Sequence, residues 1–254
     1  MFSLPVLDID SRGQLAGSDA TMSLIEFCKK DNLEGVKAAL QSGADVNAKV
    51  GHWTGLIEAV RHNRNSVVEL LLKTPNIDVN QKGNGGWCAL HWSVEAENIE
   101  GLKLLLNVPN IDVNIVDKNG YSAVHRAVVC GDNIEGLKLL LSHPSLTALT
   151  LNQKDNDHGY TPVMLAVISN KWNNGIMEHL KLLAADPRVD LDTTDKEGRS
   201  LEEVARWVFL LHSCFFLILS IMFIGHHLSV ASAIPSPLEK AEMCSIYFVN
   251  LSDQ

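Results

Sequence analysis

The sequence of 254 residues predicts an all-α solenoid of helix-turn-helix units joined by hairpin-like loops. One observation is that the nine residues NIEGLKLLL occupy positions 98–106 and return unchanged at 133–141. A second is that the preceding text repeats too, as GWCALH at 86–91 and GYSAVH at 120–125. Self-similarity with a period in the thirties is typical of a stacked array of small units.

The third residue of each such hexad, called here the marker residue, sets the period. The marker residues are Thr54, Cys88, Ser122, Thr161 and Ser200, which gives steps of 34, 34, 39 and 39 residues. We therefore expect a leader at 1–18, five units near 19–49, 50–82, 83–116, 117–155 and 156–194, and a truncated sixth unit at 195–206. We expect the leader to be flexible. The longer steps reflect an extended close at 146–157 and a widened link at 170–175, and insertions in arrays go to exposed loops.

Each unit is expected to hold two short helices. In the unit 50–82, apolar residues at helical spacing mark one helix and, after a polar break at 61–65, a second. They are Leu56, Ala59 and Val60, then Val67, Val68, Leu71 and Leu72. Thr54 stands where its hydroxyl can cap the first helix. Clusters such as KGNGG at 82–86, DKNG at 117–120 and DKEG at 195–198 favour tight turns with positive backbone angles between units.

At these residues the chain resembles the ankyrin-repeat proteins, whose first helix carries T-P-L-H-x-A. TPVMLA at 161–166, CALHWS at 88–93 and SAVHRA at 122–127 match that signature, and SGADVNA at 42–48 looks like the usual close of a unit. The resemblance covers about residues 19–206. It implies a right-handed stack whose second helices, NIEGLKLLL among them, pack against the units on either side.

The resemblance also implies a partner-binding surface on the concave side, where the turns and first helices lie. The residues just before the marker residues are Trp53, Trp87, Tyr121, Tyr160 and Arg199. Large aromatic and arginine side chains often carry interface energy, so these five are candidates for partner binding; alternatively, they pack on adjacent turns. Arg61 and His62 complete the candidate set, as a positive patch with Lys29 and Lys30 or as side chains that satisfy helix-end carbonyls.

No motif in the chain predicts catalysis, a cofactor or a metal site. There is no nucleophile elbow, P-loop or H-E-x-x-H, and the glycines at 83–86 fit a turn better than a phosphate cradle. His91 and His125 recur with the unit, and the resemblance gives them structural bonds to neighbouring loops. The five cysteines show no ligand spacing. A formal charge of -9 argues against a nucleic-acid partner.

The last part of the chain reads differently. Residues 207–224 form an apolar run that, as a helix, would span about 27 Å and is a candidate transmembrane helix, with the repeats facing the cytosol. Two other readings stay open: a cap folded on the last unit, or a tail from misjoined message. Residues 225–254 are expected to be disordered.

The sequence thus predicts a non-enzymatic, cytoplasmic module that binds a protein partner on its concave turn and first-helix surface. The alternative is a single-pass membrane-anchored adaptor that recruits cytosolic partners through the same repeats. The resemblance further marks Asn47, Asn80 and Asn114 as candidate asparagine-hydroxylation positions, whose ordinary role is turn bonding.

Overall fold

A computed structural model describes residues 17–130, 134–168 and 174–209, and over these ranges the chain is helical without a β-strand. The chain divides into two compact units, Met1–Phe215 and Phe216–Gln254, and every described residue belongs to the first. Within that unit the predicted all-α repeat architecture is confirmed.

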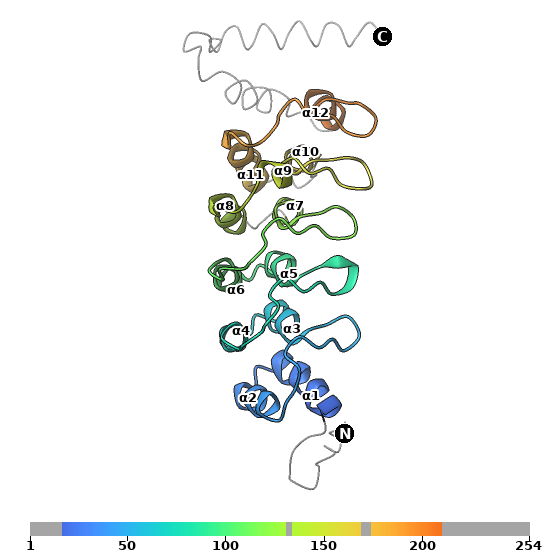
Figure 1. Ribbon diagram of the computed structural model, residues 1–254. Helices are drawn as coiled ribbons and strands as arrows, with labels where there is room; N and C mark the ends of the chain where they lie inside the picture. Colours follow the sequence, from blue (N-terminus) through green and yellow to red (C-terminus); the bar gives the residue numbers. More distant parts are fainter. Residues whose placement is uncertain (1–16, 131–133, 169–173, 210–254) are drawn as a thin grey trace, which may run out of the picture. The chain divides into compact units, whose positions relative to one another are not determined.

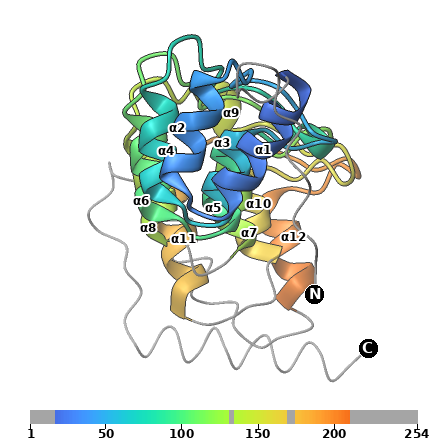
Figure 2. The same ribbon diagram turned by 90° about the horizontal axis from the view of Figure 1, so that it is seen from below.

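The helices stand in two columns (Figure 1). The first helices of successive units contact one another in order: α1 (Gly17–Lys29), α3 (Gly55–Arg61), α5 (Ala89–Glu95), α7 (Ala123–Val129), α10 (Pro162–Ile168) and α12 (Leu201–Phe209). The second helices do the same: α2 (Leu33–Gln41), α4 (Asn65–Leu72), α6 (Ile99–Leu106), α8 (Ile134–Ser142) and α11 (Asn174–Ala185). Figure 2 shows the two columns side by side, and in Figure 1 the hairpin loops project from the first-helix side.

The repeated phrase NIEGLKLLL forms α6 and α8, which contact each other in consecutive units. Leu102 and Leu105 of α6 are fully buried, and so are the matching Leu137 and Leu140 of α8. A lone helix pair cannot bury such a face, whereas a stack of pairs can. The recurrence in the sequence is therefore a packing requirement.

Asn98 explains the polar start of that phrase. Its side chain accepts from the amide of Gly101 at 2.8 Å, which caps α6, and its amide group donates to the carbonyl of Val60 in the preceding unit at 3.0 Å. A Cβ at Gly101 would lie 2.5 Å from the Asn98 side chain. The glycine thus leaves room for a cap that also ties two units together.

The predicted caps and tight turns are confirmed where they are described. Thr54 accepts from the amide of Ile57 at 3.2 Å and begins α3. The loops between units are narrow hairpins, closed by single bridges such as Val116 with Ser122. Gly120 has a φ of +80°, and a Cβ there would lie 3.1 Å from the carbonyl of Lys154 in the next hairpin. A residue without a side chain is needed at that close approach.

The extended close at 146–157 contains a helical turn that the repeat pattern did not predict. This turn, α9 (Ala148–Leu151), is capped by Thr147 and buries Leu151. A short η1 helix (Asn84–Gly86) lies in the second hairpin. The widened link at 170–175 falls largely outside the described residues.

The truncated sixth unit contributes α12, which contacts α10. The predicted apolar run 207–224 begins within α12, and its residues after Phe209 lie outside the described residues, as does the tail 225–254. Among the residues that are described, no helix has the length and apolar character to cross a membrane.

Candidate protein-binding surface

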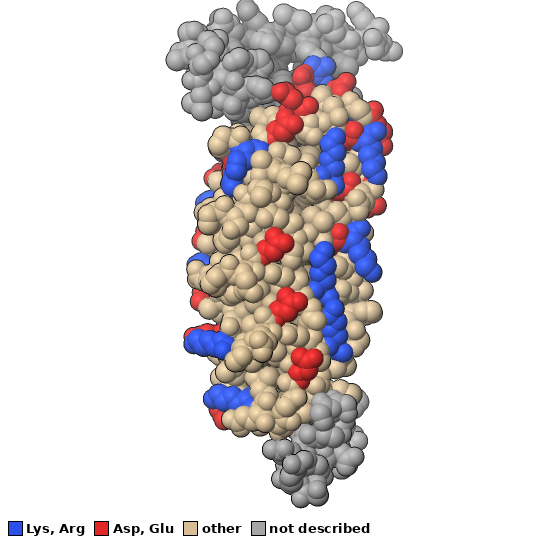
Figure 3. All heavy atoms as spheres, in the orientation of Figure 1, with Lys and Arg blue, Asp and Glu red and all other residues tan. Residues whose placement is uncertain are grey.

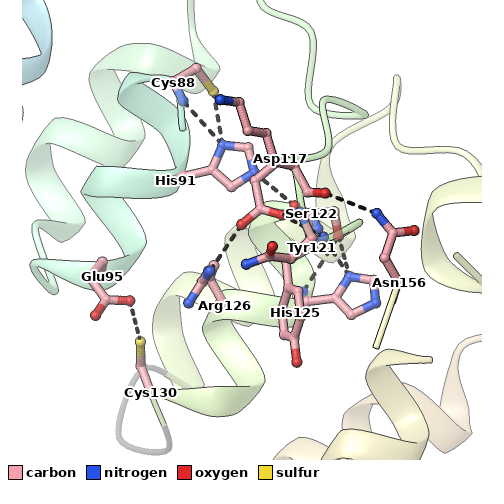
Figure 4. A network of polar contacts seen from close by, with 12 residues as sticks. Cys88, His91, Glu95, Asp117, Tyr121, Ser122, His125, Arg126, Cys130 and Asn156 are labelled. Atoms are coloured by element: carbon pink, nitrogen blue, oxygen red, sulfur yellow. Dashed lines mark hydrogen bonds and ion pairs between the residues drawn. The ribbon is translucent and has the colours of Figure 1, made fainter. Parts of the chain in front are cut away.

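The hairpins hold the candidate residues in place through an aspartate that bonds its own loop. In the third hairpin, Asp117 accepts from the amides of Asn119 and Tyr121 at 2.8 and 2.9 Å. Arg126 pairs with the other oxygen of Asp117 at 2.9 Å (Figure 4). Burial raises the pKa of Asp117, but these amides and the guanidinium outweigh it and hold the pKa below its usual range. The ionised carboxylate therefore fixes both Tyr121 and Arg126.

All five residues before the marker residues lie at equivalent places in successive hairpins, and all five are half-buried. They are Trp53, Trp87, Tyr121, Tyr160 and Arg199. Each stands two residues before the first residue of a first helix, so the file follows the first-helix column.

The structure brings three of these residues together with side chains from the first helices. The rings of Trp53 and Trp92 have centroids 5.3 Å apart, and Trp87 lies 4.7 Å from Trp92. The Arg61 guanidinium lies 4.7 Å from the Trp53 ring and 5.2 Å from the Trp92 ring. These distances are within cation–π range.

The same alternation continues into the next unit. The Arg126 guanidinium lies 4.0 Å from the Trp87 ring and 4.9 Å from the Tyr121 ring. We call the six residues that alternate in this way the aromatic–arginine cluster: Trp53, Arg61, Trp87, Trp92, Tyr121 and Arg126. These side chains pack on their neighbours, as one interpretation of the sequence expected. They also keep part of their surface exposed, which a role in partner binding requires.

His62 and Arg61 share one buried acid. Glu58 is 4% exposed, and it lies 3.3 Å from Nδ1 of His62 and 3.7 Å from the Arg61 guanidinium. His62 also lies 3.1 Å from the carbonyl of Glu58, at the end of α3. The helix-end role foreseen for His62 is therefore present in the structure, while Arg61 reaches the aromatic rings.

Tyr160 and Arg199 form a separate pair. Arg199 lies 2.7 Å from the buried Asp195 and donates to the Tyr160 hydroxyl at 3.3 Å. Burial raises the pKa of Asp195, but Arg199 and the loop amides outweigh it and lower the pKa. Among the described residues, no ring contact joins Tyr160 to Tyr121, so the predicted file divides into two groups.

His91 and His125 hold neighbouring units together, as the resemblance implied. Nδ1 of His91 accepts from the amide of Cys88 at 3.4 Å, so Nε2 carries the proton and donates to the carbonyl of Tyr121 at 3.0 Å. His125 bonds Ser122 and the carbonyl of Gln153 in the same manner (Figure 4). Burial lowers the pKa of each ring to about 4. Both are neutral structural histidines at pH 7.

The asparagines of the unit closes form a second set of links between units, which is the turn bonding expected of them. Asn80 donates to the carbonyl of Asn110 at 2.8 Å and accepts from the amide of Asp112 at 2.9 Å. Asn47 and Asn114 bond the following unit in the same way, and Asn152 continues the series.

Sequence reasoning missed Trp92 and Arg126. Both stand four residues after a marker residue, a place that Glu58 and Leu165 occupy in other units. That position lies in the first turn of the first helix, so it can meet the residue before the marker of its own unit. Comparing the residues four positions after each marker residue, as was done for the residues one position before it, would have revealed Trp92 and Arg126.

A family model described as ankyrin repeats (3 copies) matches residues 8–83, 24–117 and 90–195, which together span more than half of the chain. Among curated proteins nothing matches.

Two solved structures show the same fold. EF0377, an ankyrin repeat protein, aligns with a TM-score of 0.69 and 22% identity, over 80% of this chain and 97% of its own. An ankyrin repeat domain from Acinetobacter baumannii AYE aligns with a TM-score of 0.69 and 19% identity, over 80% of this chain and 97% of its own. At such identities the likeness concerns the fold alone.

Proposed function

This chain belongs to the ankyrin-repeat family, and from that premise we propose that it is a non-enzymatic module that binds a protein partner on its concave turn and first-helix surface. Arrays of this kind present extended concave surfaces to their partners. The observation that carries the proposal is the aromatic–arginine cluster, in which three tryptophans and two arginines gather at the hairpin bases of consecutive units.

The chemistry of the cluster suits a partner that buries its own apolar or planar groups there. Tryptophan, tyrosine and arginine are the residues that most often dominate interface energetics. The Arg61 and Arg126 guanidinia are oriented by Glu58 and Asp117. Such side chains lose little freedom on binding, which favours affinity.

Affinity capture with the full chain tests this proposal. We expect Trp53→Ala combined with Trp87→Ala to abolish capture of the specific partner, while Leu149→Ala, at an exposed apolar residue outside the cluster, leaves capture unchanged. Because the rings also pack on one another, Trp53→Phe with Trp87→Phe serves as a second variant that keeps aromatic packing, and helical circular dichroism checks the fold of each. An unchanged set of captured proteins for both ring variants would refute the proposal.

The apolar run 207–224 supports a second proposal, a membrane-anchored adaptor whose repeats face the cytosol. Carbonate extraction of cell membranes distinguishes the two. A resistant membrane pool of the full chain favours the anchored form, and complete release into the soluble fraction favours a cytoplasmic module.

A further inference from the structure

The hairpins carry an exposed lysine in each of five successive loops. We call these residues the lysine file: Lys49, Lys82, Lys118, Lys154 and Lys196. Figure 3 shows Lys and Arg atoms gathered in a broken column on the right, over the hairpin side of Figure 1. No ion pair with a described residue neutralises any member.

The first three hairpins each carry an exposed lysine and no exposed carboxylate, whereas Asp157 and Glu197 are exposed in the fourth and fifth. Residues 47–53, 81–87 and 115–121 contain one carboxylate, Asp117, which is buried and paired with Arg126. This positive edge stands out because the chain has a formal charge of -9. The lysine file is therefore positively charged on a chain whose net charge is negative.

From the second hairpin onward the hairpins are bonded to one another, so the lysines after Lys49 stand on a fixed base. The amide of Lys118 donates to the carbonyl of Gly85 at 2.8 Å, and that of Asn156 donates to Asn119 at 2.8 Å. The Lys82 ammonium donates to the carbonyl of Val116 at 2.9 Å and is held over the next hairpin. Positions that are fixed before binding favour recognition of a ligand with a matching repeat.

Helix packing sets the spacing of the hairpins that carry the lysines, and within each unit the lysine stands four to seven residues before the marker residue. Packed helices lie about 8–10 Å apart, and each unit supplies one lysine. A polyproline II helix has three residues per turn and rises about 3.1 Å per residue, so every third side chain recurs on one face after about 9 Å. The spacing of the hairpins and the three-residue period of a polyproline II helix are therefore close enough for flexible lysine side chains to reach every third residue of such a helix.

A parallel series of aspartates limits where an acidic ligand can lie. Asp45, Asp78, Asp112 and Asp190 are exposed at the unit closes, and each accepts from the backbone amide two residues later. These carboxylates would repel an acidic chain. An acidic ligand is thus directed to the hairpin edge, beside the aromatic–arginine cluster.

We propose that the partner presents an extended, polyproline II-like segment with Asp or Glu at every third position, and that the lysine file binds this acidic face. The inference rests on the proposed function, because it names the chemical class of the partner at the same surface. The carboxylates of this acidic segment lie along the hairpins, and the residues between them reach toward the rings of the aromatic–arginine cluster.

Fluorescence anisotropy with the full chain at low ionic strength tests the proposal, using a labelled peptide of five Glu-Pro-Ser triplets. A peptide of identical composition with its glutamates in one block is the spacing control, and a single-stranded oligothymidylate of equal charge is the polyanion control. We expect the triplet peptide to bind at least about fivefold more tightly than either. Equal binding of the block peptide or of the oligothymidylate, or no binding of the triplet peptide, would overturn the proposal.

Charge-neutralising variants locate the site. Replacing Lys49, Lys82 and Lys118 together by Gln removes three exposed charge pairs, so we expect binding of the triplet peptide to weaken about tenfold. The same change at Lys73, Lys103 and Lys138, which lie at or in second helices, alters net charge equally and is expected to change binding less than about twofold. Equal losses in the two variants would show that only net charge matters and would overturn the proposal.

Replacing the three file lysines by Arg keeps the charge and should keep binding, which separates a lost contact from a lost fold. The two proposals also fail separately. If partner capture depends on Trp53 and Trp87 but not on the lysine file, the acidic-segment inference alone is wrong.

Discussion

Single side chains that bond in two directions join each unit to the next. His91 accepts inside its own unit and donates to the carbonyl of Tyr121 in the following one. The bond within a unit is readable from sequence, as the cap at Thr54 shows, because its donor and acceptor lie three residues apart. The ring contacts of Trp92 are not readable from one unit, because Trp53 comes from another.

The two buried histidines predict a loss of stability in mild acid. Their pKa is about 4 in the folded chain against an ordinary value of 6.5. Between these values the unfolded chain binds protons that the folded chain does not, so the free energy of unfolding falls as pH falls. We expect about 3 kcal/mol to be lost between pH 7 and pH 5 for the pair.

Urea unfolding at both pH values measures this loss. The double variant His91→Gln, His125→Gln should be less stable at pH 7 but lose less on acidification than the original chain, because glutamine does not titrate. The variant also serves as the control for carboxylates that titrate in the same range. Parallel pH profiles for the two proteins would contradict the prediction.

At the level of helices, identical sequences occupy equivalent environments. The apolar spacing was sufficient to predict the second helices because each buries one face, as α6 does with Leu102 and Leu105. The first helices are buried nearly all round, as α3 and α10 are. The one-turn helix α9 was not predictable from the repeat, since it lies in an insertion. Its cap depends on Asn114 of the preceding unit, which accepts from Thr147 and Thr150 at 3.1 and 2.7 Å.

Equivalent leucines should therefore cost the same to truncate. Leu105→Ala in α6 and Leu140→Ala in α8 each empty a fully buried site, and we expect each to lower the free energy of unfolding by about 2–5 kcal/mol. Leu104→Ala, at a half-buried neighbour, should cost clearly less. Chemical denaturation compares the three variants, and a loss at Leu104 as large as at Leu105 would contradict the shared packing.

Among the described helices, every closely packed pair belongs to one unit or to adjacent units. Stability is then close to a sum of unit and interface contributions. The sequence predicted the order of the units and the period, because these follow from repetition alone. It left open which candidate residues form a group. The group ends at Tyr121 because Leu165 occupies, in the fifth unit, the position that Trp92 and Arg126 hold in the third and fourth.

The first described unit should open more readily than the middle ones. Within the part of the chain that the structure describes, the helix pair α1 and α2 packs on one adjacent unit, whereas α5 and α6 pack on two. We expect amide hydrogens of α1 and α2 to exchange faster than those of α5 and α6 in native buffer, as measured by hydrogen exchange with mass spectrometry. Uniform protection along the array would indicate a single cooperative unit instead.

The shared face of α6 and α8 also bears on how such a chain can change over generations. Because both helices offer the same leucines to whatever lies above and below, a recombination event between the two copies would delete or duplicate one whole layer and leave a compatible junction. The number of units can then change without a compensating change elsewhere in the chain. The lysine file would gain or lose one lysine with each such change.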